Sequence, residues 1–308
     1  MPDVVVIGAV NMDIGAVSSA ALIPKDSNPG RVGTSLGGVG RNIAHNLCLL
    51  GVDTAMVTVL GDDAFASAVR RGAEEIGLDL SHSAVVSGAR TSTYVYLAQP
   101  DGDMALAVSD MEIYTHMTPD YLSERLDFIN SAKLMVLDAN LPEESIAWLC
   151  DHVTVPIVAD PVSTVKAKKL KPVLGKLTAL KPNRLEAERL TGLPIWDVAD
   201  ARRAAEKLLA TGLKQVYISL SSDGVYAANS TGERAYYPCP AVRVVNATGG
   251  GDAMVAALTA SLLWGEGLAR TAQNAICAGA IASMADTTIQ PELSWKNIEK
   301  LRESEVWK

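Results

Sequence analysis

Short apolar runs alternate with amphipathic segments along most of the chain. The apolar runs are brief and rich in β-branched residues, which is typical of strands that are buried on both faces. The segments between them repeat apolar residues at the spacing of a helix. The pattern predicts strands at residues 4–10, 54–60, 133–137, 155–159 and 216–220, and helices at residues 42–50, 64–76, 143–150, 185–191, 199–209, 253–264 and 268–284.

This alternation predicts an α/β fold in which a parallel sheet is flanked by helices on both faces. Two regions interrupt it. Residues 11–36 contain a polar stretch followed by a strand-like segment, and residues 91–108 have the pattern of a hairpin that turns around Gly102. We expect both regions to form a small β-sheet that acts as a lid over the carboxyl edge of the parallel strands. The whole chain, residues 1–308, is expected to be a single domain.

Composition and charge exclude several classes of protein. The 308 residues are 48% apolar, which is ample for a large core. The net charge of −8 and the lack of a long basic run argue against a nucleic-acid partner. The four cysteines are scattered and form no Cys-x-x-Cys pair, as in reduced cytoplasmic proteins. No apolar stretch is long enough to span a bilayer, so we expect a cytoplasmic protein without a membrane partner.

The strongest chemical signal is a glycine-rich loop near the C-terminus. Gly249, Gly250 and Gly251 precede Asp252, and an apolar helical segment follows at once. Glycines let backbone N–H groups converge, and a helix N-terminus favours an anion such as phosphate. A carboxylate beside that anion would repel it unless it serves as a general base for an attacking hydroxyl. On these residues alone, a glycine-rich turn with an ordinary acidic residue in the first helical turn explains the pattern equally well.

A second group of candidate residues lies near the N-terminus. Asp13 follows the first strand, where parallel sheets bind ligands, and its carboxylate can accept hydrogen bonds from two vicinal sugar hydroxyls. Turn formation or helix capping is the more common role of such an aspartate. Gly37 and Gly38 lead into a helix and would allow close backbone approach to a ligand that Asn42 binds. A simple glycine-rich helix entry is the alternative.

Two polar clusters in the second half of the chain allow a structural and a functional interpretation. Asn183 and Glu186 have the spacing of a helix capping box, and the same pair could hold water around Mg²⁺. Ser219 and Gly224 bound a tight turn after a strand, which suits the lining of an adenine or ribose pocket.

In order and spacing, the segment 36–42, the pair Asn183 and Glu186, and the segment 247–252 resemble the ribokinase-like (PfkB) carbohydrate kinase family over roughly the whole chain. The resemblance implies ATP with Mg²⁺ and transfer of the γ-phosphoryl group to a primary hydroxyl of a small-molecule sugar or nucleoside. It also implies a β lid, through which two copies could form a homodimer.

The resemblance also implies roles for individual residues. Asp252 would be the base, with Gly249, Gly250 and Gly251 as the anion hole. The substrate would contact Asn11, Asp13, Ser27, Asn28, Gly37, Gly38, Asn42, Thr93 and Lys166. The nucleotide would contact Asn183, Ser219, Gly224, Thr248, Gly249, Gly251 and Asn274, and Glu186 with Asn183 would hold the metal through water.

The chain departs from the family pattern in two ways within the glycine-rich loop. Asn246-Ala247 stands where the family usually has Asp-Thr, and Gly250 stands where it usually has Ala. In relatives with a monovalent-cation site the missing aspartate contributes to that site, so we expect no such site here. A sugar or nucleoside sensor without turnover is the alternative from another class, but the presence of Asp252 and the glycines argues against it.

Overall fold

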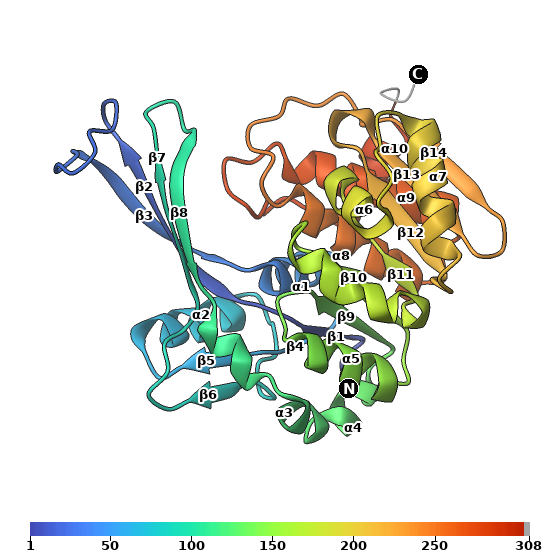
Figure 1. Ribbon diagram of the computed structural model, residues 1–308, viewed down its shortest axis with the longest axis horizontal. Coiled ribbons are helices and arrows are strands. Elements are labelled where there is room, and N and C mark those ends of the chain that lie inside the picture. Colours follow the sequence, from blue (N-terminus) through green and yellow to red (C-terminus); the bar gives the residue numbers. More distant parts are fainter. Residues whose placement is uncertain (305–308) are drawn as a thin grey trace.

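The computed structural model describes residues 1–304, which form one large sheet and two smaller ones (Figure 1). The large sheet has the strand order β14-β13-β12-β11-β10-β9-β1-β4. Its strands are β1 (Val4–Ile7), β4 (Thr54–Val57), β9 (Leu134–Asp138), β10 (Ile157–Asp160), β11 (Ala179–Leu180), β12 (Gln215–Ser219), β13 (Val225–Asn229) and β14 (Arg234–Tyr237). The pairs from β4 to β12 are parallel, whereas β13 and β14 extend the sheet in antiparallel fashion. The predicted α/β class is confirmed, with an antiparallel edge that was not predicted.

One predicted strand is divided. Residues 54–60 form β4 in the large sheet and then β5 (Val59–Gly61), which pairs with β6 (Ala84–Val86) in a sheet of its own. The break falls at Thr58, whose N–H donates to the Ser83 hydroxyl and whose C=O accepts from the Tyr121 hydroxyl. Because side chains satisfy this peptide, the chain leaves the large sheet without losing hydrogen bonds.

Helices cover both faces of the large sheet (Figure 1). Along β1, Val4 and Val6 enter one apolar cluster, and Val5 and Ile7 enter the other, as the alternation of a strand requires. The first cluster contains residues of α1 (Val39–Leu49), α2 (Ala64–Glu75), α8 (Gly250–Leu263), α9 (Leu268–Ala282) and α10 (Trp295–Arg302). The second contains residues of η1 (Glu112–His116), α3 (Pro119–Ser123), α4 (Leu126–Ser131), α5 (Glu143–His152), η2 (Lys166–Lys176), α6 (Arg184–Thr191) and α7 (Val198–Leu209). No helix within residues 1–304 is long and apolar enough to cross a membrane.

The remaining sheet projects away from the main body (Figure 1). Its order is β3-β2-β7-β8, from β2 (Asn11–Ser18), β3 (Gly30–Gly37), β7 (Thr93–Ala98) and β8 (Met104–Asp110). Both segments that interrupt the alternation in the sequence therefore form one small sheet. Its register pairs Asp13 with Tyr94 and Ile14 with Val95, so the sheet has an Asp13 face and a Val95 face.

Candidate active site

Two buried carboxylates end the adjacent strands β9 and β10. Asp138 accepts the N–H groups of Ala9, Gly40 and Asn140, each at 2.8 Å. These bonds tie the end of β1 to the first turn of α1, and they oppose the burial that raises the pKa of Asp138. On the next strand, Asp160 is buried as well. The carboxyl edge of the sheet is therefore organised around acidic groups.

Lys181 supplies the positive charge at this edge. It follows β11, is 5% exposed, and places its Nζ 3.2 Å from Oδ2 of Asp160. Burial lowers the pKa of Lys181, but the carboxylates of Asp160, Glu186 and Asp252 outweigh burial and raise it. The lysine therefore stays charged in a nearly closed environment, which is favourable only where several carboxylates surround it.

Asp252 lies in the first turn of α8, half-buried, and accepts a hydrogen bond of 2.9 Å from Nδ2 of Asn42. Burial and the charge of Asp160 raise the pKa of Asp252 to about 7, against the opposing effects of Asn42 and Lys181. A general base is most effective when its pKa is near the working pH. The surroundings of Asp252 thus suit a proton acceptor at neutral pH.

The glycines beside Asp252 have different roles. Gly249 has φ +85°, and a Cβ there would lie 2.0 Å from the Thr288 carbonyl oxygen, so only glycine fits this N-cap. Gly250 and Gly251 are already helical, and no side chain caps their N–H groups. A Cβ at Gly251 would lie 3.0 Å from Nζ of Lys181. Uncapped N–H groups and a buried ammonium group therefore meet at one point, which is an arrangement that binds phosphate.

Asp13 forms the other end of the site. Its Oδ1 is buried and has no hydrogen-bond partner among the described residues, and a Cβ at Gly37 would lie 2.0 Å from Oδ2. Burial raises the pKa of Asp13 to about 6, although the Arg41 charge lowers it. The next residue along α1 after Arg41 is Asn42, which binds Asp252, so α1 connects the two carboxylates. An unpaired buried oxygen of this kind needs a donor, which a ligand hydroxyl would supply.

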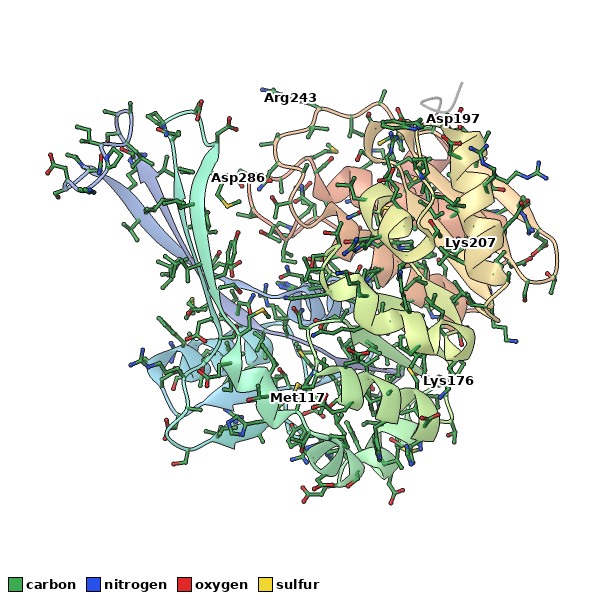
Figure 2. All side chains as sticks on the ribbon, viewed as in Figure 1. Met117, Lys176, Asp197, Lys207, Arg243 and Asp286 are labelled. Atoms are coloured by element: carbon green, nitrogen blue, oxygen red, sulfur yellow. The ribbon has the colours of Figure 1, made fainter. Side chains whose placement is uncertain are left out.

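A cavity of about 400 Å³ adjoins the glycine-rich loop, between the turn that follows β12 and the helices α8 and α9. Four of the predicted site residues line it, namely Asn183, Ser219, Gly250 and Gly251, and Lys181 lies at its inner end beside Gly251. Figure 2 shows Asp286 on the loop after α9, on the side of the main body that faces the small sheet. Gly251, the neighbour of Asp252, lines the cavity, and Asn42, which binds Asp252, follows Arg41 beside Asp13. Asp252 therefore connects the cavity to the Asp13 end of the site.

Four residues predicted for the nucleotide pocket do not line this cavity, and one of them is Gly249, the N-cap of α8. Asn274 is buried, donates to the Ser261 hydroxyl at 3.0 Å, and accepts from Arg302 at 2.6 Å, so its amide joins α8, α9 and α10. Gly224 has φ +106° in the turn before β13, where a Cβ would lie 2.0 Å from the Tyr237 carbonyl oxygen. Thr248 is exposed in the loop before α8. Packing and turn geometry account for Asn274 and Gly224.

Three residues predicted to contact the substrate do not lie beside Asp13. The Asn28 amide closes its own loop, accepting from Ile23 N–H at 2.8 Å and donating to the carbonyls of Ile23 and Asp26 at 3.0 Å. Its neighbour Ser27 is exposed in the same loop, which joins β2 to β3 at the outer end of the small sheet (Figure 1). Thr93 pairs with Met12, so its side chain lies on the Val95 face and not on the Asp13 face.

Other predicted contacts are engaged with protein groups at the sheet edge. Asn11 accepts the Ser92 hydroxyl at 2.8 Å, on the Asp13 face. Gly38, with φ +94°, is the N-cap of α1. Lys166 donates to Oδ1 of Asn140 and lies 3.2 Å from the Met111 sulfur, which brings it to the carboxyl edge near Asp138.

Asn183 and Glu186 form the capping box that their spacing predicts. The Asn183 side chain accepts the Glu186 N–H at 2.9 Å, and Oε2 of Glu186 accepts the Asn183 N–H at 2.8 Å. Burial and the charge of Asp160 raise the pKa of Glu186, whereas Lys181 lowers it. The capping role is thus established for this pair, and Glu186 still faces the charged cluster at the cavity.

Sequence reasoning did not assign a role to Lys181, Asp138 or Arg41. A usable signal existed for Asp138, because it is a charged residue at the end of a buried strand that the pattern predicts. For Arg41 there was none, since its place opposite Asp13 depends on how the small sheet meets α1.

Comparison with known proteins agrees with this geometry. The model of the pfkB family of carbohydrate kinases matches residues 1–293. The chain belongs to the pfkB family of carbohydrate kinases. This kinase is 36% identical to the pseudouridine kinase of Escherichia coli K12, over 98% of the chain and 96% of that protein.

Solved structures of similar shape support the same assignment. A putative sugar kinase from Clostridium perfringens superposes with a TM-score of 0.87 at 31% identity, covering 98% of this kinase and 96% of that chain. The Arabidopsis thaliana ribokinase complexed with ribose and ATP superposes with a TM-score of 0.88 at 24% identity, covering 99% of both chains. The second likeness, at this identity, concerns the fold.

Proposed function

We propose that this kinase transfers the γ-phosphoryl group of ATP to the 5′-hydroxyl of pseudouridine. The observation that carries the proposal is the placement of Asp252, a carboxylate whose pKa is raised to about 7, between an anion site and the unpaired carboxylate of Asp13. The similarity to a pseudouridine kinase at 36% identity, over 98% of the chain, supports this choice of nucleoside.

Each part of the site has a distinct task in this reaction. Asp13 accepts hydrogen bonds from the ribose hydroxyls, and this orients the 5′-hydroxyl toward Asp252. Asp252 accepts the hydroxyl proton as the oxygen attacks phosphorus. Lys181 and the N–H groups of Gly250 and Gly251 stabilise the negative charge that builds up on the transferred group. The cavity between α8 and α9 holds the rest of the nucleotide.

Mg²⁺ fits the acidic end of the cavity. Among residues 1–304, no group of three or more His, Cys, Asp and Glu side chains is arranged to hold a metal ion. Mg²⁺ keeps several waters and takes few protein ligands, so Glu186 with Asn183 would hold it through water. Burial, followed by the charge of Asp160, raises the pKa of Glu186, and a bound cation would favour its ionised form. When bound, the ion would neutralise charge on the transferred phosphoryl group.

We predict that the wild-type kinase prefers pseudouridine to uridine by at least roughly tenfold in kcat/KM, because a polar group left unpaired by the wrong base costs about 1–3 kcal/mol. Pseudouridine joins ribose to C5 of the base, so it presents a ring N–H that uridine lacks. The Asn28 amide is engaged in its own loop, and the Lys166 ammonium group at the carboxyl edge only donates, so it would bind a carbonyl oxygen of the base and not this N–H. ADP release with pseudouridine, uridine, adenosine, inosine, ribose and fructose tests the proposal. Equal or better turnover of another acceptor would contradict the substrate but not the kinase activity. No ADP release with any acceptor, together with nucleoside binding, would indicate a sensor.

Potassium is expected to have little effect on activity. The Asn246 side chain accepts the Thr248 N–H at 2.9 Å and donates to the Asp286 carbonyl oxygen at 3.2 Å. An amide that donates to this carbonyl satisfies it without a cation, and it brings no negative charge of its own. Rates in potassium, sodium and choline chloride at one ionic strength should agree. Strong activation by potassium alone would show that carbonyl oxygens suffice to bind the cation.

We also propose that the Val95 face of the small sheet pairs two copies of the chain. Three apolar side chains on this face are largely exposed: Val32 by 72%, Leu106 by 69% and Val108 by 70%. A contiguous exposed apolar surface is rare on a monomeric protein and is typical of an interaction site. A two-fold axis would bring the same face of both copies together. Sedimentation velocity of the wild type should show a dimer, and a monomer at all accessible concentrations would contradict the proposal.

A further inference from the structure

Two tyrosines on the Asp13 face of the small sheet have no role in the reaction described above. Tyr94 pairs with Asp13, and Tyr96 pairs with Gly15, in the parallel register of β2 and β7. Because side chains alternate along a strand, both tyrosines lie on the same face as the unpaired carboxylate of Asp13. The two rings lie side by side, with their centroids 6.0 Å apart.

The ring of Tyr96 lies across the backbone of Gly15. A Cβ at Gly15 would be 2.3 Å from the Tyr96 hydroxyl oxygen and 2.4 Å from Cζ, so any larger residue would displace the ring. Gly33 follows Gly15 in the same row of the sheet, and a Cβ at Gly33 would meet nothing within 4 Å. In this row the ring of Tyr96 therefore lies on Gly15, and the space above Gly33 is open. Tyr96 is only half-buried, so part of its ring remains accessible.

The distance between this row and Asp13 suits a nucleoside. Gly15 lies two residues beyond Asp13 along β2, which corresponds to about 6.6 Å of strand. This is roughly the offset between the ribose hydroxyls and the base of a nucleoside. If Asp13 holds the ribose and the 5′-hydroxyl points to Asp252, the base extends toward the row of Tyr96. An accessible aromatic ring is a good stacking surface for any base, since every base has a π face.

We propose that Tyr96 is a specificity-determining residue that stacks against the nucleobase, so that the kinase selects nucleosides over free pentoses. The proposal rests on the nucleoside kinase function proposed above. Stacking supplies affinity for a base of any kind, whereas the choice among bases depends on polar contacts. Tyr96 therefore acts on the distinction between a nucleoside and ribose, and not on that between pseudouridine and uridine.

The test compares Tyr96→Leu with Tyr96→Phe, using pseudouridine and ribose as acceptors. Leucine is apolar and keeps the side chain bulky in a strand, but it has no π face; phenylalanine keeps the ring and removes only the hydroxyl. We expect Tyr96→Leu to lower kcat/KM for pseudouridine by roughly tenfold to a hundredfold, while kcat/KM for ribose changes little. Tyr96→Phe should stay close to the wild type with both acceptors. Calorimetric titration of pseudouridine into each variant without nucleotide should show the same order of affinities.

The outcomes separate the two proposals. If Tyr96→Leu lowers kcat/KM for pseudouridine and ribose by equal factors, or leaves both unchanged, the stacking role is wrong and the nucleoside kinase function stands. If Tyr96→Phe loses as much activity on pseudouridine as Tyr96→Leu, the hydroxyl and not the ring contacts the substrate, which also overturns the stacking role. If the wild type phosphorylates ribose and no nucleoside, the proposed function is wrong and the stacking role is wrong with it.

Discussion

Replacing Asp252 by Asn is expected to lower kcat by roughly 10²–10⁴-fold, the usual contribution of a general base. The amide has nearly the shape of the carboxylate, and its oxygen can still accept the Asn42 hydrogen bond that Asp252 accepts at 2.9 Å. What it cannot do is take the proton of the attacking hydroxyl. Nucleotide affinity should change little, because the anion site that we propose consists of Lys181 and the backbone of Gly250 and Gly251. Steady-state rates and nucleotide titrations by calorimetry measure the two effects separately.

The stability of the same variant at different pH values provides a control for folding. The folded-state pKa of Asp252 is about 7, above the ordinary value of 3.8, so its ionised form destabilises the folded protein. This cost is absent below about pH 4, grows as the pH rises, and is complete above pH 7. Asp252→Asn should therefore be at least as stable as the wild type at pH 8, with the difference vanishing toward pH 4. Turnover within a few-fold of the wild type in a folded Asp252→Asn variant would contradict the role of base.

The second large effect is expected from Lys181→Met. The buried ammonium group is 3.2 Å from the Asp160 carboxylate, and its removal leaves Asp160, Glu186 and Asp252 without a cation. Removing one partner of a buried ion pair typically costs about 3–5 kcal/mol. We expect the free energy of unfolding in urea at pH 7 to fall by that amount. Loss of the lysine charge should also raise the pKa of Asp252 further, since Lys181 lowers it in the wild type.

Two further variants test whether the burial of Lys181 is responsible for its large effect on stability. Lys176 forms an ion pair with Asp151 in which both side chains are about half exposed, so Lys176→Met should cost no more than about 1 kcal/mol (Lys176 is labelled in Figure 2). Adding Asp160→Asn to Lys181→Met removes one of the unpaired charges and should restore part of the lost stability. If Lys181→Met is no more destabilising than Lys176→Met, the lysine does not hold the acidic cluster together.

The sequence was most informative where residues that act together are also neighbours in the chain. Asp252 and its glycines lie within four consecutive positions, and Asn183 with Glu186 lies within one helical turn, so both groups were recognisable from spacing. Lys181 was not recognisable from spacing, because the carboxylates that surround it come from separate elements of the structure, namely Asp160, Glu186 and Asp252. Strand β11, which positions Lys181, has only two residues and leaves no periodic pattern.

The candidate substrate residues that lie away from the Asp13 face have a related explanation. The family resemblance implied a substrate contact for Thr93, but the face on which its side chain lies depends on the register between β2 and β7. A shift of one residue in that register would place Thr93 on the Asp13 face, where Tyr94 now lies. Asn28 was assigned because its amide offers both a donor and an acceptor on a segment expected to fold over the base, whereas the structure shows that the loop itself uses this amide.

The most direct test of this account is the dependence of kcat/KM for pseudouridine on pH, measured with saturating Mg²⁺ in the wild type and in Asp252→Asn. Because the base must be ionised and its pKa in the free enzyme is about 7, kcat/KM should rise with pH up to that value and level off above it. Asp13, with a pKa of about 6, adds a second and lower ionisation, which should be the one that remains in the variant. A wild-type profile that is flat through pH 7, or a variant that keeps the same transition as the wild type, would contradict the assignment of Asp252 as the base.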